Sequence, residues 1–172
     1  MRAEATAERT LALLTELGRA TKGARLYLTG GASAVLVGWR ERTVDVDIRL
    51  DGDEDRLLRA ISTLKERLDI NIELAGPLDF LPEPDGWRDR SPSVGRFGGL
   101  EVFHTDFALQ ALSKIERGSP QDLDDVRAML DRGLTDAHAI RRTFQTIRPG
   151  LYRFPAIDAD RLAAQVTAAL PG

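Results

Sequence analysis

Two short segments in the first third of the chain carry residues whose types and spacing suit chemistry on phosphate groups. The first, residues 26–33, reads LYLTGGAS, an apolar run that ends in a glycine pair and then a serine. The second, residues 43–49, reads TVDVDIR, in which two aspartates alternate with aliphatic residues. Together, the two segments predict a place where a phosphate chain lies beside a divalent metal ion.

The two aspartates, Asp45 and Asp47, are predicted to lie on one face of a strand. Val44, Val46 and Ile48 take the alternate positions and would share the opposite face. Two carboxylates one strand repeat apart, roughly 7 Å between their α-carbons, repel each other unless a cation lies between them. We therefore predict that both aspartates bind Mg²⁺ or Mn²⁺, although a half-exposed strand with two incidental acids would show the same pattern.

The glycine pair is predicted to bring the backbone close to a bound nucleoside triphosphate. Because glycine has no side chain, Gly30 and Gly31 allow close approach, and a helix expected at residues 31–38 would begin there. The free amides of its first turn and the hydroxyl of Ser33 would then suit phosphate oxygens. The alternative is a tight strand-to-helix turn in which the glycines serve packing alone.

An apolar strand, a Gly-Gly pair and then Asp-x-Asp on the next strand resemble the signature of the DNA polymerase beta-like nucleotidyltransferase superfamily. Two later segments, LSKIER at residues 112–117 and QDLDDV at residues 121–126, resemble the AbiEii/MenT-type nucleotidyltransferases, many of which are toxins of toxin–antitoxin pairs. The resemblance covers roughly residues 24–130. One departure is Gln121, because those families often carry a basic residue immediately before the aspartate that aligns with Asp122.

The resemblance implies roles for two residues of these later segments. Lys114 would reach the triphosphate, and Asp122 would orient Lys114 or a metal-bound group. Both residues also have structural alternatives. Lys114 lies near the end of a helix expected to run to about residue 117, where a cation interacts favourably with the helix dipole. Ser119 and Pro120, followed by Asp122, fit the start of the next helix, with serine as the cap.

A third acidic residue, Glu73, is a candidate for the same site. Residues 69–74 alternate like the Asp-x-Asp segment and predict another strand, with the aliphatic residues on one face and Asn71 and Glu73 on the other. If this strand lies beside the Asp-x-Asp strand, Glu73 would complete a carboxylate triad and act as a base for the attacking hydroxyl. The alternative is a solvated glutamate.

The resemblance implies a metal-dependent transfer of a nucleoside monophosphate from a nucleoside triphosphate to an acceptor hydroxyl, with release of pyrophosphate. In the toxin-type branch, the acceptor would be RNA, for example tRNA, and the partner would be a separately encoded antitoxin. Two other classes stay open. One is nucleotidylation of a protein or of a small molecule, as by antibiotic-modifying enzymes. The other is a degenerate fold that binds nucleotides without catalysis.

The last third of the chain contains a local excess of positive charge. No acidic residue occurs between Asp136 and Asp158, whereas aromatic residues there are interleaved with four arginines: Arg141, Arg142, Arg148 and Arg153. Arginine contacts with phosphates and aromatic stacking on unpaired bases would suit an RNA groove. The alternative is a helix with a solvated face and an aromatic core stripe.

Composition excludes several other classes of protein. The chain has 172 residues, 42% of them hydrophobic and 30% charged, which is typical of one globular domain. It has no cysteine and only two histidines, so disulfides and thiolate sites are excluded and a histidine-rich zinc site is not expected. The net charge is −3, and no apolar run reaches the ~20 residues that span a bilayer, so we expect a cytoplasmic protein without a membrane partner.

These residues must be positioned by a sheet and several helices. We expect helices at residues 3–21, 31–38, 54–68, 105–117, 135–147 and 158–169 and a hairpin that turns at Gly98-Gly99. The helix at 54–68 is expected to direct five residues toward the core: Leu57, Leu58, Ile61, Leu64 and Leu68. The proline-rich loop at 76–86 is expected to be anchored in the core by Phe80 and Trp87, although both rings could instead stack on a base.

The predicted fold is α/β or α+β, with a small mixed sheet flanked by helices. We expect helices against one face of the sheet and a catalytic groove on the other. The whole chain, 1–172, is predicted to form a single nucleotidyltransferase-like domain, with its core at about 24–104 and a helical C-terminal part at about 105–172.

Overall fold

The computed structural model describes all residues, 1–172, and groups them into two compact units. The sheet unit comprises Met1–Gly76 and Ser91–Thr105, and the helical unit comprises Pro77–Arg90 and Asp106–Gly172. One boundary coincides with the predicted start of the helical C-terminal part, whereas the proline-rich loop belongs to the helical unit. Whether the chain behaves as a single domain stays a prediction.

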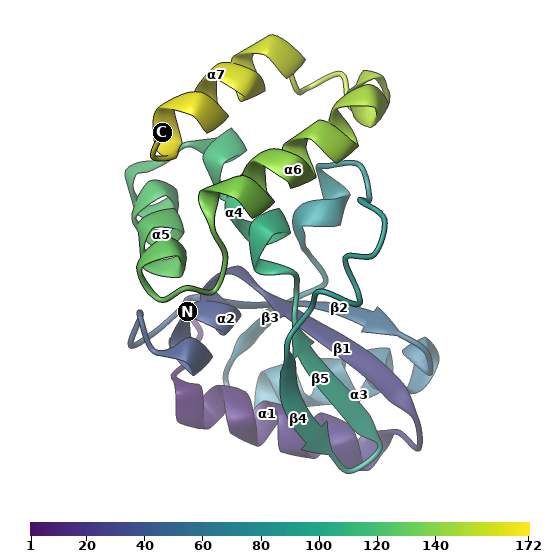
Figure 1. Cartoon of the computed structure of the whole chain (residues 1–172). Coiled ribbons are helices and arrows are strands. Elements are labelled where there is room, and N and C mark those ends of the chain that lie inside the picture. Colours follow the sequence, from purple (N-terminus) through teal and green to yellow (C-terminus); the bar gives the residue numbers. More distant parts are fainter. The chain divides into compact units, whose positions relative to one another are not determined.

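The sheet unit is built on five strands in the order β3-β2-β1-β5-β4 (Figure 1). Their bounds are β1 (Ala24–Thr29), β2 (Asp45–Asp51), β3 (Asn71–Glu73), β4 (Ser93–Phe97) and β5 (Leu100–His104). Strand β1 runs antiparallel to β2 and parallel to β5, β2 runs parallel to β3, and β4 forms an antiparallel hairpin with β5. The predicted small mixed sheet with an antiparallel edge is therefore confirmed.

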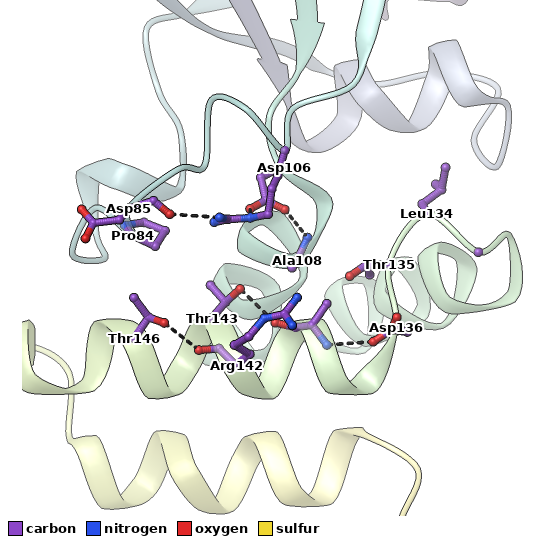
Figure 2. A pocket seen from close by; sticks show the side chains of 13 residues that line it. Pro84, Asp85, Asp106, Ala108, Leu134, Thr135, Asp136, Arg142, Thr143 and Thr146 are labelled. Atoms are coloured by element: carbon purple, nitrogen blue, oxygen red, sulfur yellow. Dashed lines mark hydrogen bonds and ion pairs between the residues drawn. The ribbon is translucent and has the colours of Figure 1, made fainter.

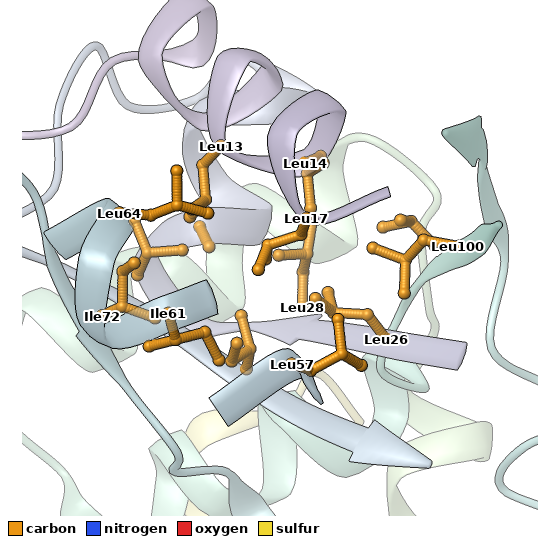
Figure 3. Packing of buried hydrophobic residues seen from close by; sticks show 14 of the residues in the cluster. Leu13, Leu14, Leu17, Leu26, Leu28, Leu57, Ile61, Leu64, Ile72 and Leu100 are labelled. Atoms are coloured by element: carbon orange, nitrogen blue, oxygen red, sulfur yellow. The ribbon is translucent and has the colours of Figure 1, made fainter. Parts of the chain in front are cut away.

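Two amphipathic helices, α1 (Ala7–Ala20) and α3 (Glu54–Arg67), cover one face of this sheet. Figure 3 shows Leu14 and Leu17 of α1 and Leu57 of α3 packed with Leu26 and Leu28 of β1 in one buried cluster. Each fully buried leucine contributes about 1.5–3 kcal/mol to folding. Because the apolar strand residues point toward these helices, the alternate residues of β2 are left to carry polar groups on the opposite face.

Strand β2 follows the predicted alternation in its paired part. Val46 and Ile48 are buried, whereas Asp45 and Asp47 are half-buried. Val44 differs from the prediction, since 64% of its surface is exposed. The reason is that β2 begins at Asp45, so Val44 lies before the sheet that would have covered it.

Two other apolar residues of the predicted elements are also exposed. Leu74 is 54% exposed because β3 ends at Glu73, so the predicted alternation continues past the paired residues. Leu58 is 40% exposed because it lies at the border of the apolar stripe of α3, in which Leu57 and Ile61 take the buried positions. Both differences come from the extent of packing, which a local pattern does not specify.

The helical unit contains four α-helices and two short 3₁₀ turns. Their bounds are η1 (Pro77–Asp79), α4 (Phe107–Arg117), α5 (Pro120–Asp131), α6 (Ala137–Ile147), η2 (Arg148–Arg153) and α7 (Ala159–Ala169). Helix α4 packs against α5, α6 and α7 and ends, as predicted, at Gly118, whose φ of +67° favours glycine. No helix in the chain combines the length and apolar character needed to cross a membrane.

The loop before β4 is anchored by one aromatic residue, not by two. Trp87 is 1% exposed, its Nε1 donates to Glu83 Oε1 at 2.6 Å, and the Arg88 guanidinium lies 4.5 Å from the centre of its ring. Phe80, by contrast, is 58% exposed. The prediction that Phe80 anchors the loop in the core is wrong, because the 3₁₀ turn at its start buries Pro77 and Leu81 instead.

Candidate functional site

The predicted acids lie together on two neighbouring strands, and we call Asp45, Asp47 and Glu73 the carboxylate face. In the parallel pairing of β2 with β3, Asp45 lies opposite Asn71 and Asp47 lies opposite Glu73. Paired strands are about 4.8 Å apart, so these residues are direct neighbours on the sheet. The predicted adjacency of the two strands is confirmed, and the role of Glu73 as a base stays a prediction.

An amide links two members of the carboxylate face. The Asn71 Nδ2 group donates to Asp45 Oδ1 and, at 3.1 Å, to Glu73 Oε1. A donor between two carboxylates offsets part of their repulsion without adding charge. The sequence placed Asn71 on this face but assigned it no role, because only the strand pairing shows that it lies between the acids.

Gly30 and Gly31 are required to be glycine for different structural reasons. Gly30, the first residue of α2 (Gly30–Val37), has a φ of +58°, and a Cβ there would lie 3.1 Å from Asp47 Oδ2. A Cβ on Gly31 would lie only 1.9 Å from Thr43 Oγ1. Gly31 is therefore explained by packing alone, whereas Gly30 places the backbone at the start of a helix directly beside a carboxylate.

Ser33 does not face a ligand as the sequence predicted. Its side chain is fully buried, and its hydroxyl donates to the Leu28 carbonyl oxygen at 3.3 Å. The hydroxyl also lies 2.9 Å from His104 Nδ1, a contact that joins α2 to the end of β5. The fourth residue of α2 thus turns into the sheet unit, and its hydroxyl is used within the protein.

His104 was not expected to take part in any site. Burial of the imidazole lowers the pKa of His104 from 6.5 to about 4, because the charged form loses its hydration. The ring is therefore neutral at neutral pH and suits a hydrogen bond with Ser33. No local signal in the sequence joins two residues on separate elements in this way.

The carboxylate face suits a hard cation. Asp45 and Asp47 are half-buried oxygen donors on one strand face, and Mg²⁺ or Mn²⁺ prefers such ligands. The chain contains no converging group of three or more histidine, aspartate or glutamate side chains. Magnesium commonly binds through one or two carboxylates together with water and substrate phosphates, so a pair of aspartates fits this mode of binding.

The other two predicted catalytic residues, Lys114 and Asp122, belong to the helical unit, where they form an ion cluster with Arg117 and Asp125. Lys114 is 4% exposed, and its Nζ donates to Asp125 Oδ2 at 2.6 Å and to Asp122 Oδ1 at 3.3 Å. Arg117 Nη2 donates to the same Asp122 oxygen at 2.6 Å. Two cations and two carboxylates therefore balance one another at the contact of α4 with α5.

Asp122 also takes part in the predicted start of α5. The Asp122 backbone amide donates to Ser119 Oγ at 3.1 Å, and the Ser119 hydroxyl donates to Asp122 Oδ2 at 2.7 Å. Burial would raise the pKa of Asp122, but hydrogen bonds from Ser119 and Arg117 and the charges of Arg117 and Lys114 outweigh burial and lower it. These contacts give Asp122 a structural role, while the predicted triphosphate contact of Lys114 and orienting role of Asp122 stay predictions.

Two arginines of the basic stretch contact other parts of the helical unit. Arg148 forms an ion pair with Asp160 at 3.1 Å, and its guanidinium lies 5.6 Å from the centre of the Phe144 ring. Arg153 lies 5.3 Å from the centre of the Tyr152 ring and donates to its hydroxyl at 2.9 Å. These contacts favour the alternative in which this part of the stretch is a solvated face.

The other two arginines, Arg141 and Arg142, differ although they are adjacent on α6. Arg141 Nη2 donates to the carbonyl oxygen of Pro171 near the C-terminus. The exposed guanidinium of Arg142 makes no hydrogen bond or ion pair within the chain, and it lines a cavity. Of the four arginines, Arg142 is the one whose charge is not engaged by the protein.

Comparison with known proteins identifies a family and a similar fold. The family described as "Nucleotidyltransferase of unknown function (DUF6036)" matches residues 8–149. The chain is also similar to a crystal structure of an antigenic nucleotidyltransferase-like protein from Paracoccidioides brasiliensis, with a TM-score of 0.52 and 12% identity over 99% of this chain and 97% of that one. Such a likeness shows the fold. Comparison with curated proteins gives no match.

Proposed function

We propose that this chain, which belongs to the family of nucleotidyltransferases of unknown function, transfers a nucleoside monophosphate from a nucleoside triphosphate to an acceptor hydroxyl with the help of Mg²⁺ or Mn²⁺. The observation that carries the proposal is the carboxylate face. Asp45 and Asp47 lie side by side on β2, Glu73 lies opposite Asp47, and the first residue of α2 lies against Asp47. The family that matches is not the AbiEii/MenT-type branch. The proposal for the reaction therefore rests on the nucleotidyltransferase superfamily.

Each group in this proposal has a defined task. Asp45 and Asp47 would hold the metal, whose positive charge would draw the phosphates to the carboxylate face and stabilise charge on the reacting oxygens. The first turn of α2, which begins beside Asp47, would direct backbone amides toward the triphosphate. Gly31 supports this approach indirectly, because it lets the start of α2 pack closely against Thr43.

The reaction is a displacement at the α-phosphorus. The acceptor oxygen forms a bond to this phosphorus while the bond to the oxygen that bridges to the β-phosphate breaks, and pyrophosphate leaves. The carboxylate of Glu73 takes the proton of the acceptor hydroxyl, directly or through one water. Asn71 keeps Glu73 and Asp45 at a fixed separation, so it is a positioning residue for both acids.

The direct test is a transfer assay on variants of β2. Asp45→Asn and Asp47→Asn should each abolish transfer of label from a radioactive nucleoside triphosphate, while the free energy of unfolding changes by no more than about 0.5 kcal/mol. Asp51→Asn is the matched control, because Asp51 is a half-buried acid on the same face of the same strand and forms an ion pair with Arg49. If all three variants transfer label at the same rate, Asp45 and Asp47 do not bind the metal.

For the acceptor, we propose a hydroxyl of RNA, for example tRNA, as in toxin-type nucleotidyltransferases that act with a separately encoded antitoxin as partner. The support is the sequence resemblance together with Arg142, whose guanidinium is not engaged by the protein. The competing acceptors are a small molecule or a protein. Incubation of the chain with labelled triphosphates and separate fractions of RNA, protein and metabolites identifies the acceptor by the fraction that becomes labelled.

A non-catalytic nucleotide-binding module gives a different result in the same experiments. A triphosphate with Mg²⁺ would then raise the melting temperature, because it binds the folded state, but no fraction would become labelled. Transfer that disappears in Asp45→Asn would exclude the module. If a triphosphate raises the melting temperature equally with and without Mg²⁺, the metal takes no part in nucleotide binding, whether the chain is an enzyme or a binding module.

A further inference from the structure

The helical unit contains a cavity of about 500 Å³ that has no part in the carboxylate face (Figure 2). This volume lies within the range of small-molecule sites in proteins. One face of α6 supplies a wall through Arg142, Thr143 and Thr146, and other lining residues come from the loop before β4, the start of α4 and the turn before α6. Most of these residues are polar, so the cavity suits a polar ligand.

The charged groups of the cavity are not all engaged. Arg90 Nε donates to Asp106 Oδ2 at 2.8 Å, and Arg90 Nη1 donates to the Asp85 carbonyl oxygen at 2.9 Å. Asp106 is 4% exposed and also accepts from the amide of Ala108 at the start of α4. Arg90 and Asp106 therefore neutralise each other and form a fixed part of the wall.

Two lining groups have no partner within the chain. The guanidinium of Arg142 makes no hydrogen bond or ion pair, and the hydroxyl oxygen of Thr135 is buried without a hydrogen bond. Figure 2 shows both residues on the lining of the cavity. Because the Thr135 oxygen is buried whereas Arg142 is exposed, the guanidinium of Arg142 is the group that a ligand in the cavity would contact.

We propose that this cavity binds a phosphate group carried by a hydroxyl-bearing ligand of nucleoside monophosphate size. The planar guanidinium of Arg142 matches two oxygens of a phosphate. The carboxylate of Asp136, which accepts from the Ala139 amide at the start of α6, keeps acceptor capacity for a sugar hydroxyl. A phosphomonoester carries more negative charge and more free oxygens than a carboxylate, so phosphate is the better match to Arg142.

The cavity shares no residue with the carboxylate face, because every lining residue lies in the helical unit. Its test therefore measures binding alone, by calorimetry in EDTA, with adenosine 5′-monophosphate as the probe and adenosine as the control ligand. The monophosphate should bind and adenosine should not. Arg142→Gln should weaken binding on the order of tenfold to a hundredfold, as expected for a lost charged hydrogen-bonded contact.

Arg141→Gln is the matched control variant, since Arg141 is the neighbouring residue on α6 and contacts Pro171 instead of the cavity. This variant should bind the monophosphate as the wild type does. The proposal is overturned if the monophosphate does not bind, or if Arg142→Gln and Arg141→Gln bind it equally.

A second arm identifies the source of the phosphate. A short single-stranded RNA without terminal phosphates offers phosphodiesters only, whereas inorganic phosphate and adenosine 5′-monophosphate offer free phosphate oxygens. Binding of the RNA that depends on Arg142 assigns the cavity to a polynucleotide backbone, and binding of the small probes alone assigns it to a free phosphomonoester. Because Asp45→Asn should leave all of these affinities unchanged, failure of the proposed transfer activity does not affect this result.

Discussion

The carboxylate face of the sheet unit and the ion cluster of the helical unit both gather acidic side chains, and they balance the charge differently. In the ion cluster, Asp122 and Asp125 accept hydrogen bonds from the ammonium of Lys114. On the carboxylate face, Asp45 and Glu73 accept hydrogen bonds from Asn71, a neutral amide. In the cluster, Lys114, Asp122 and Asp125 are buried, whereas on the face Asp45 and Asp47 are half-buried and Glu73 is exposed.

This difference distinguishes two uses of charge. Buried charges that are fully paired hold elements together, and removing one partner is costly because the other stays buried. Acids that lie close together on a partly open strand face stay accessible to a metal or another positive group, which relieves their repulsion when it binds. The comparison therefore favours a structural role for the ion cluster in the packing of α4 on α5, and it agrees with the proposal that the carboxylate face binds a metal.

The largest expected effect is the loss of the buried ammonium. Lys114→Met keeps the length of the side chain but leaves Asp122 and Asp125 buried without their shared cation. We expect a loss of about 3–5 kcal/mol in the free energy of unfolding, measured by urea denaturation. The control is Arg127→Met, which removes an exposed ion pair with Asp124 and should cost less than about 1 kcal/mol.

The opposite outcome would reverse the assignment of this cluster. If Lys114→Met is as stable as the wild type but no longer binds a nucleoside triphosphate, Lys114 contacts the substrate as the family resemblance implies. The structural and catalytic roles are thus separated by two measurements on one variant.

The elements of the carboxylate face could be predicted from the sequence because their signals are local. Asp45 and Asp47 occupy alternate positions between aliphatic residues, and alternation directly sets the face of a strand. The glycine at the strand-to-helix turn is also a local signal, since Gly30 has a positive φ. The strand that carries Glu73 was expected as a possible neighbour for the same reason.

The remaining features depend on packing between distant segments. Ser33 was expected to face a ligand, but which side of α2 turns inward is set by the sheet and by His104, 71 residues away. Lys114 was recognised as a cation near a helix end, but its partner Asp125 lies on the next helix. Sequence spacing predicts which residues share one face of a helix or strand. Only the tertiary structure shows which other element packs against that face.

The second-largest expected effect is a loss of stability at acidic pH, which is caused by His104 of the sheet unit. The folded pKa of His104 is about 4 and its ordinary value is 6.5, so the unfolded chain binds a proton first as the pH falls. Its contribution to stability is complete above pH 6.5 and is lost as the pH falls from 6.5 toward 4. We expect a loss of about 2–3 kcal/mol across this range in urea denaturation of the wild type.

The variants His104→Gln and His138→Gln check this pH dependence. His104→Gln should remove the loss between pH 6.5 and 4, and His138→Gln, at an exposed residue of α6, should keep it. The lowered pKa of Asp122 acts in a more acidic range, because its contribution is present above the ordinary value of 3.8 and is lost as the pH falls through the folded value. An equal pH dependence in both histidine variants would show that another group is responsible.

The smallest expected effect tests the carboxylate face itself. Asn71→Asp replaces the bridging amide by a third negative charge between Asp45 and Glu73, and Asn71→Ser is the neutral control that also lacks the amide. Without metal, Asn71→Asp should be about 1 kcal/mol less stable than Asn71→Ser, because like charges at this separation repel.

Millimolar Mg²⁺ should reduce that difference, since a cation bound among the acids stabilises the folded state by mass action. The measurement is urea denaturation of both variants in EDTA and in Mg²⁺, at constant ionic strength so that general screening does not contribute. If the two variants are equally stable in EDTA, the acids are too far apart or too well solvated to repel, and the contrast with the ion cluster disappears. If they differ in EDTA and Mg²⁺ has no effect, the acids repel but do not form the proposed metal site.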